Sequence, residues 1–135
     1  MCALLLAALA MVSACRKDTQ QSDLSQPPMA SVIAGVWHLD LRTSPRQPSM
    51  TKPMTLLLHI IDNHGQEVND AQVSGVLTMK VMDMGATPLQ FAAKGNGDYA
   101  ASAKAVDMAG PWNLAVDVKQ APAEAKANFE VVVGE

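Results

Sequence analysis

Apolar residues alternate with polar ones along most of the chain after about residue 34. In the stretch 112–119, WNLAVDVK, nearly every second side chain is large and apolar. A period of two residues is typical of a β-strand that buries one face. Similar alternation, or a short apolar run between turn residues, occurs in seven stretches, namely 36–41, 54–62, 71–81, 89–94, 98–106, 112–119 and 128–133. No stretch has a convincing helical period, so the pattern predicts an all-β chain.

Turn residues separate these seven stretches. The sequence NHG (63–65) is a turn signal, and GNG (95–97) supplies residues that tolerate positive φ angles, which is a hairpin signal. Three prolines mark 42–53 as a loop, and 121–127 is predicted to be a polar loop. About seven antiparallel strands with frequent turns indicate an immunoglobulin-like β-sandwich, and a closed barrel is the alternative.

The first 33 residues lack the regular alternation of the later chain. Residues 1–14, MCALLLAALAMVSA, form an apolar run that ends in small residues, as an export signal does. The residues leading to Cys15 resemble the lipobox of bacterial lipoproteins, which implies a lipidated Cys15 after cleavage. A transmembrane anchor is the alternative, but spanning takes roughly 20 apolar residues. We therefore expect a lipoprotein signal peptide (1–14), a lipidated cysteine with a flexible linker (15–33) and one domain (34–135).

Composition narrows the function further. The net charge is −3 and no basic stripe appears, which argues against nucleic-acid binding. Lipidation of Cys15 and removal of Cys2 would leave no thiol for a zinc site, a disulfide or a nucleophile. No nucleophile elbow or phosphate loop is present, so an enzyme is not expected. By resemblance to lipoprotein sorting signals, Arg16 points to the periplasmic face of a Gram-negative outer membrane.

Methionines are the main candidates for chemistry. Met79 shares the parity of Leu77 and Val81 and is predicted to face the core with them, whereas Met82 and Met84 have the opposite parity. If Met108 lies at the same end of the domain, three thioethers would converge. Thioethers are soft ligands that suit Cu(I). Methionine also fills irregular gaps in cores, so a purely structural role stays open.

Three other residues are predicted to be structural. Trp112 alternates with apolar residues and should anchor the core, and Gly110 belongs to the turn before it. Tyr99 should pack or tie a loop through its hydroxyl, as in the corners of sandwiches. The histidines, His38, His59 and His64, are expected on polar faces or in turns.

An ordered series of short motifs resembles the YtkA-like domain family, which has relatives of the FixH protein of cytochrome oxidase assembly. The residues that carry the resemblance are Asp62, Gly65 and Val68; Met79, Met82 and Met84; Gly95, Gly97 and Tyr99; and Met108, Gly110 and Trp112. The resemblance covers about residues 34–135. Many members have Met-Pro where this chain has Met79-Lys80, so its methionine spacing departs from the common form. The resemblance implies an immunoglobulin-like sandwich outside the cytoplasm, near copper handling or oxidase assembly.

Two functions follow as expectations. The first is a membrane-anchored domain that binds Cu(I) or Ag(I) through Met82, Met84 and Met108. The second is an interaction module without metal that assists a membrane complex such as an oxidase or efflux system. In the second, exposed methionines would form an adaptable apolar contact patch.

Overall fold

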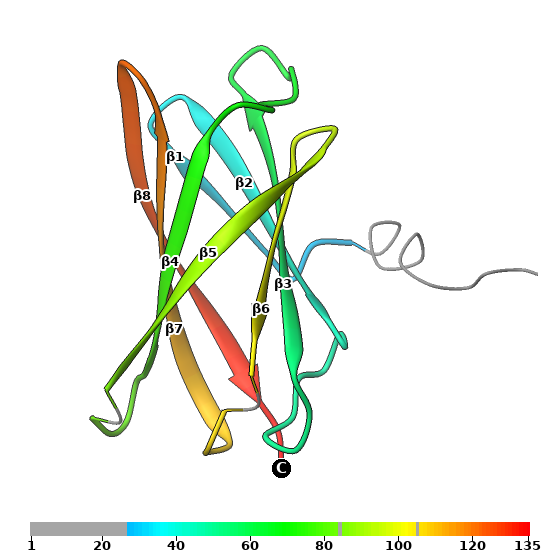
Figure 1. Cartoon of the computed structure of the whole chain (residues 1–135), viewed down its shortest axis with the longest axis vertical. Helices are drawn as coiled ribbons and strands as arrows, with labels where there is room; N and C mark the ends of the chain where they lie inside the picture. Colours follow the sequence, from blue (N-terminus) through cyan, green and yellow to red (C-terminus); the bar gives the residue numbers. More distant parts are fainter. Residues whose placement is uncertain (1–26, 84, 105) are drawn as a thin grey trace, which may run out of the picture.

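The computed structural model describes residues 27–83, 85–104 and 106–135, and these residues form eight β-strands (Figure 1). The strands are β1 (Ala30–Ala34), β2 (Trp37–Ser44), β3 (Met54–Asp62), β4 (Gln72–Met79), β5 (Ala86–Gly95), β6 (Asp98–Ala103), β7 (Gly110–Gln120) and β8 (Ala123–Val133). No helix occurs in the described part of the chain, and therefore none there is able to cross a membrane. The all-β prediction is confirmed.

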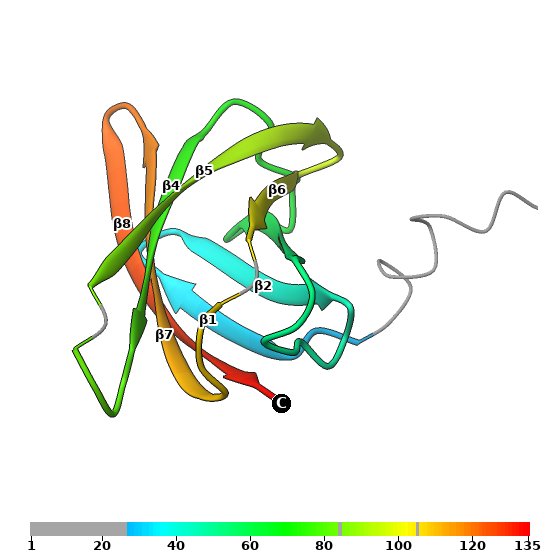
Figure 2. The same cartoon turned by 60° about the horizontal axis from the view of Figure 1, so that its bottom comes forward.

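All strand pairs are antiparallel, and the hydrogen-bonded order is β1-β2-β3-β6-β5-β4-β7-β8. β5 joins two layers, because its first part pairs with β4 and its last residues pair with β6. Figure 2 shows the sheet curling so that β1 and β8 approach each other. The result is an antiparallel sandwich whose layers form one continuous, nearly barrel-shaped sheet.

Two strand boundaries differ from the sequence prediction. Four of the five residues of β1 lie in 15–33, which was predicted to be linker, and β1 pairs with the first five residues of β2. β8 begins at Ala123, so most of the loop predicted at 121–127 is strand. Both segments bury mainly alanine, which has a low preference for strands and gives a weak apolar signal. The structure thus has eight strands instead of seven.

The core fills the space between the two layers. Along β2, β3 and β7, alternate side chains are buried, as the sequence pattern predicts. The largest fully buried residues are Tyr99, Leu39, Leu41, Leu56, Leu58, Ile60, Leu77, Leu114, Val116, Val118, Val131 and Val133. One expectation was wrong. Val81, predicted to face inward with Leu77 and Met79, is 67% exposed because β4 ends at Met79.

Tyr99 ties the connection between β3 and β4, which passes from one layer to the other, to strand β6. Its hydroxyl donates to the carbonyl oxygen of Val68 (2.7 Å) and accepts from the backbone N–H of Ala71 (3.1 Å). Tyr99 is only 1% exposed, and burial raises the pKa of its hydroxyl. The predicted loop tie through this hydroxyl is confirmed.

Two turns near the Tyr99 hydrogen bonds lie where the sequence predicts them, after β3 and between β5 and β6. The carboxylate of Asp62 accepts from the backbone N–H groups of His64 (2.8 Å) and Gln66 (2.9 Å). The bond from Gln66 is the main cause of the lowered pKa of Asp62. Gly97, in the hairpin between β5 and β6, has φ of 77°, and a Cβ there would come within 2.8 Å of the carbonyl oxygen of Ile60. Only glycine fits this close approach.

Candidate functional site

The end of β4 and the start of β7 bring two of the predicted methionine segments to the same end of the molecule. Met79 pairs with Trp112, and the backbone N–H of Lys80 donates to the carbonyl oxygen of Pro111 (3.1 Å). The loop that carries Met82 therefore starts beside the turn that carries Met108, at the lower end of Figure 1. The two segments therefore lie at a common end of the domain, as three converging thioethers would require.

Three residues predicted to be structural interlock at this end. Met79 is 8% exposed and Trp112 is 5% exposed, so both belong to the core. The indole Nε1–H of Trp112 donates to the carbonyl oxygen of Met108 (3.1 Å), which closes the turn. Gly110 has φ of 131°, and a Cβ there would lie 2.9 Å from Cε of Met79. The turn before β7 is therefore packed tightly over the Met79 methyl group.

The predicted metal ligands have unlike surroundings. Met82 is 52% exposed, whereas Met108 is partly buried against the core. Met108 lines a shallow groove with Met50, Thr51, Asp107, Ala109 and Glu135, and Met82 is not among the residues that line it. Met84 and Cys15 lie outside the described residues. The second thioether in the groove is thus Met50, which lies in the loop between β2 and β3 and has no sequence pattern that links it to Met108.

Exposed apolar side chains gather around the loop after β4. Val81 and Met82 are 67% and 52% exposed, and Val132 on β8 is 59% exposed. Pro111 on β7 pairs with Val132 and accepts the hydrogen bond from Lys80, so it lies between the loop and β8. We call the four residues Val81, Met82, Pro111 and Val132 the tip patch. The exposure of Val81 could not be predicted from its strand-like parity.

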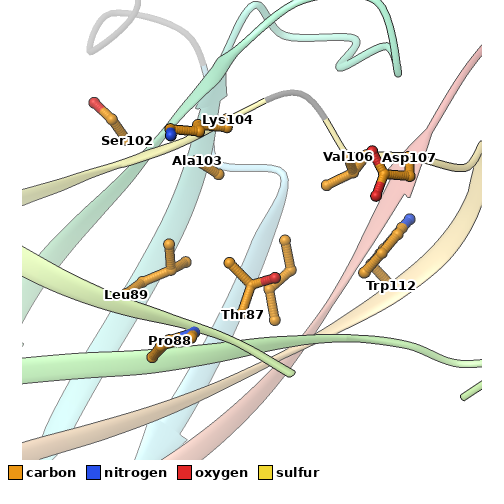
Figure 3. Close-up of a pocket in the computed structure, with 10 residues that line it drawn as sticks. Thr87, Pro88, Leu89, Ser102, Ala103, Lys104, Val106, Asp107 and Trp112 are labelled. Carbon is orange, nitrogen blue, oxygen red and sulfur yellow. The ribbon is translucent and has the colours of Figure 1, made fainter. Parts of the chain in front are cut away.

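A cleft of about 430 Å³ opens between β5 and β6 (Figure 3). Its floor contains Leu77, Leu89 and Trp112, which are otherwise buried. In Figure 3, Thr87 and Leu89 face the opening from β5, and Ala103 faces it from β6. Lys104 and Asp107 stand at its edge. We call this the β5–β6 cleft, and the sequence pattern gave no sign of it.

The histidines are placed on polar surfaces. His59 on β3 bonds through Nδ1 to Asp98 on β6 (2.8 Å), and His38 bonds through Nε2 to Asp40 on β2 (3.0 Å). His64 is exposed in its turn. Among the residues that the structure describes, no group of three or more His, Cys, Asp or Glu side chains is placed to hold a metal ion.

The strand order, the loop tie through Tyr99 and the turn closed by Trp112 can be compared with known families. A model of the YtkA-like family matches residues 32–117. The chain belongs to the YtkA-like family. The match runs from within β1 to within β7. A comparison with curated proteins found no match.

The motifs that carry the resemblance to the YtkA-like family serve mainly to close turns in this chain. Asp62 caps the turn after β3, and Gly97 allows the hairpin before β6. Tyr99 holds the connection between the layers, and Trp112 holds the turn before β7. The motifs therefore stabilise the turns and connections of the domain. The tip patch and the β5–β6 cleft are surfaces of this fold that the motifs do not explain.

Proposed function

We propose that this YtkA-like protein is a membrane-anchored, extracytoplasmic interaction module that contacts a membrane protein complex through the tip patch and has no catalytic role. The observation that carries the proposal is the exposure of Val81 and Met82, 67% and 52%, in a loop at the end of the domain. Clustered exposed apolar side chains mark interaction sites. Methionine adapts its shape to a partner, so it suits such a surface.

The anchor is the second part of the proposal. Cys15, in a lipobox-like sequence, would carry the lipid, and several acyl chains hold a protein firmly to a membrane. The chain between Cys15 and β1 reaches at most roughly 50 Å when extended. That reach lets the tip patch meet the extramembrane part of a complex such as an oxidase or efflux system. The proposed location is the periplasmic face of a Gram-negative outer membrane.

Binding of Cu(I) or Ag(I) through Met82, Met84 and Met108 is the second candidate. The observation in its favour is the hydrogen bond between Lys80 and Pro111, which joins the two methionine-bearing segments at one end. Thioethers bind soft monovalent cations without losing a proton. Asp107, next to Met108, would add an attractive charge.

Two substitutions separate the candidates, because one changes apolarity and the other removes sulfur. Val81→Glu introduces a charge into the tip patch and leaves every thioether in place. Met82→Leu keeps the patch apolar but removes a soft ligand. For an interaction module, Val81→Glu should abolish partner contact and Met82→Leu should preserve it. For a metal site, Met82→Leu should weaken Cu(I) binding and Val81→Glu should not.

Partner contact is measured by photo-crosslinking of the full-length protein in membranes, with the crosslinker at position 82. Position 76 on β4 is the matched control, since Val76 is 37% exposed but lies outside the tip patch. A defined crosslinked product from position 82 alone supports the proposal. Equal labelling from both positions would refute it. Cu(I) binding is measured by competition with a chromophoric chelator, with Met29→Leu as the thioether control.

A further inference from the structure

β5 changes partner along its length, and this leaves strand edges unpaired on both sides of the β5–β6 cleft. β5 pairs with β4 over residues 86–91 and with β6 only from Ala92 onward. On β6, pairing to β5 stops at Ala100, although the strand continues to Ala103. In the described part of the chain, no backbone bond joins β5 before Ala92 to β6 beyond Ala100. The backbone groups that face this gap therefore have no strand partner.

The two edges are not equivalent. Pro88 lies on the β5 side and has no N–H to donate, so that edge is a poor template for a further strand. On the β6 side, Ser102 points its N–H and C=O away from β3 and into the gap, whereas Ala101 and Ala103 direct theirs to Leu56 and Met54 on β3. A new strand would therefore bond to the backbone of Ser102 on β6 and only lie against β5.

The floor of the cleft and its edge define the side chains that such a strand would need. Leu77, Leu89 and Trp112 offer an apolar floor, which accepts small or branched apolar groups. Lys104 and Asp107 are exposed at the edge, and within the described residues neither forms an ion pair. Their opposite charges suit a segment of low net charge with an acidic side chain that meets Lys104.

We propose that the β5–β6 cleft binds an extended peptide segment of a partner protein, which adds a strand to the free edge of β6. In this mode the main chain supplies affinity and alternate side chains supply specificity. The segment would place apolar residues over Leu89 and Trp112 and polar residues outward. The site is separate from the tip patch, so this proposal does not depend on the function proposed above.

The test uses the full-length protein in detergent and the probe peptide acetyl-Thr-Val-Glu-Val-Thr-Val-Ser-amide. Binding is followed by NMR through the backbone amide of Ser102 and the indole N–H of Trp112. Hydrogen exchange at the Ser102 amide reports new backbone pairing. The control peptide has proline in place of the middle valine, which removes a donor and prevents regular pairing.

A matched pair of variants on β5 controls for nonspecific binding. Thr87→Trp adds bulk at the cleft, whereas Gln90→Trp adds the same bulk at an exposed β5 position that does not line it. We expect saturable shifts, exchange at Ser102 slowed at least about tenfold, and affinity reduced at least about tenfold by Thr87→Trp only. The proline peptide should not bind.

Three results would overturn the proposal. The first is no saturable shift up to about 1 mM peptide, the weak limit of specific binding. The second is a shift without slower exchange at Ser102, which would indicate a small-molecule type of groove instead of a strand site. The third is slow exchange at Ser102 before any peptide is added, which would mean that another segment of the chain or a second copy already occupies the gap.

Discussion

Replacement of Tyr99 by phenylalanine removes one oxygen atom from the centre of the fold. That oxygen donates to the Val68 carbonyl and accepts from the Ala71 N–H, and the phenylalanine ring fills the same space. The variant therefore isolates the polar tie from packing. Val68 is buried, so its carbonyl loses its partner with little access to water, whereas Ala71 is partly exposed.

The expected loss of stability follows from the two backbone groups that lose their partner, the Val68 carbonyl and the Ala71 N–H. A buried polar group left without a partner costs about 1–3 kcal/mol, and a group that reaches water costs less. We expect Tyr99→Phe to lower the free energy of unfolding by about 2–3 kcal/mol. In a domain of about 100 residues each kcal/mol shifts Tm by about 4–8 °C, so Tm should fall by roughly 10–20 °C.

Thermal unfolding followed by circular dichroism and urea unfolding measure the loss. Thr43→Val is the control, because the Thr43 hydroxyl donates to Sδ of Met29 (2.9 Å) and to the carbonyl oxygen of Arg46 (3.2 Å), and both of these residues are exposed. Thr43→Val should lower the free energy of unfolding by less than Tyr99→Phe does. A fall in Tm of less than about 3 °C for Tyr99→Phe would show that the tie does not hold the connection.

The same hydroxyl gives a pH prediction with a definite sign. Burial raises the pKa of Tyr99 in the folded state above the ordinary value of about 10. Its contribution is complete below that ordinary value and is lost as pH rises through the higher, folded pKa. Tyr99 is the one tyrosine of the chain, so alkaline absorbance titration reports it directly. Titration at or below the ordinary value would contradict the buried tie.

Three further predictions test other parts of the frame. Gly110→Ala should destabilise the domain by about 1–3 kcal/mol in urea unfolding, because φ is 131° and a Cβ would lie 2.9 Å from Cε of Met79; Gly65→Ala, with open space around it, should cost less. The pKa of Asp62, measured by NMR, should lie below its ordinary value. The contribution of Asp62 to the free energy of unfolding should be present above that ordinary value and be lost as pH falls through the lower, folded pKa. Asp62→Ala should remove this loss of stability at acid pH. Met79→Ala should cost about 2–5 kcal/mol and Met82→Ala within about 0.5 kcal/mol, since only Met79 is buried; equal losses in thermal unfolding would contradict this assignment.

Local patterns predicted the strands well where large side chains alternate. Trp112, Leu114 and Val116 mark their strand clearly, since each second residue is both apolar and large. The same rule missed β1 and the start of β8, where the buried residues are mainly small. It also extended β4 by two residues, because Val81 keeps the correct parity after the hydrogen-bonded ladder has ended.

The candidate site was less predictable than the fold. Parity correctly separated buried Met79 from exposed Met82. It could not show that Met50 accompanies Met108, because the two lie in different loops and meet only through the tertiary fold. The β5–β6 cleft depends on where β5 exchanges one partner for another, and that exchange is set by the curvature of the whole sheet.

The change of partner along β5 also determines how the domain should unfold. Because β5 shares its backbone bonds between β4 and β6, neither layer can melt without removing part of the support of the other. The chain crosses between the layers again before β4, where Tyr99 fastens it. We therefore expect one cooperative unfolding transition and no half-folded state with a single intact layer. Heating or mechanical pulling should therefore disrupt both layers together.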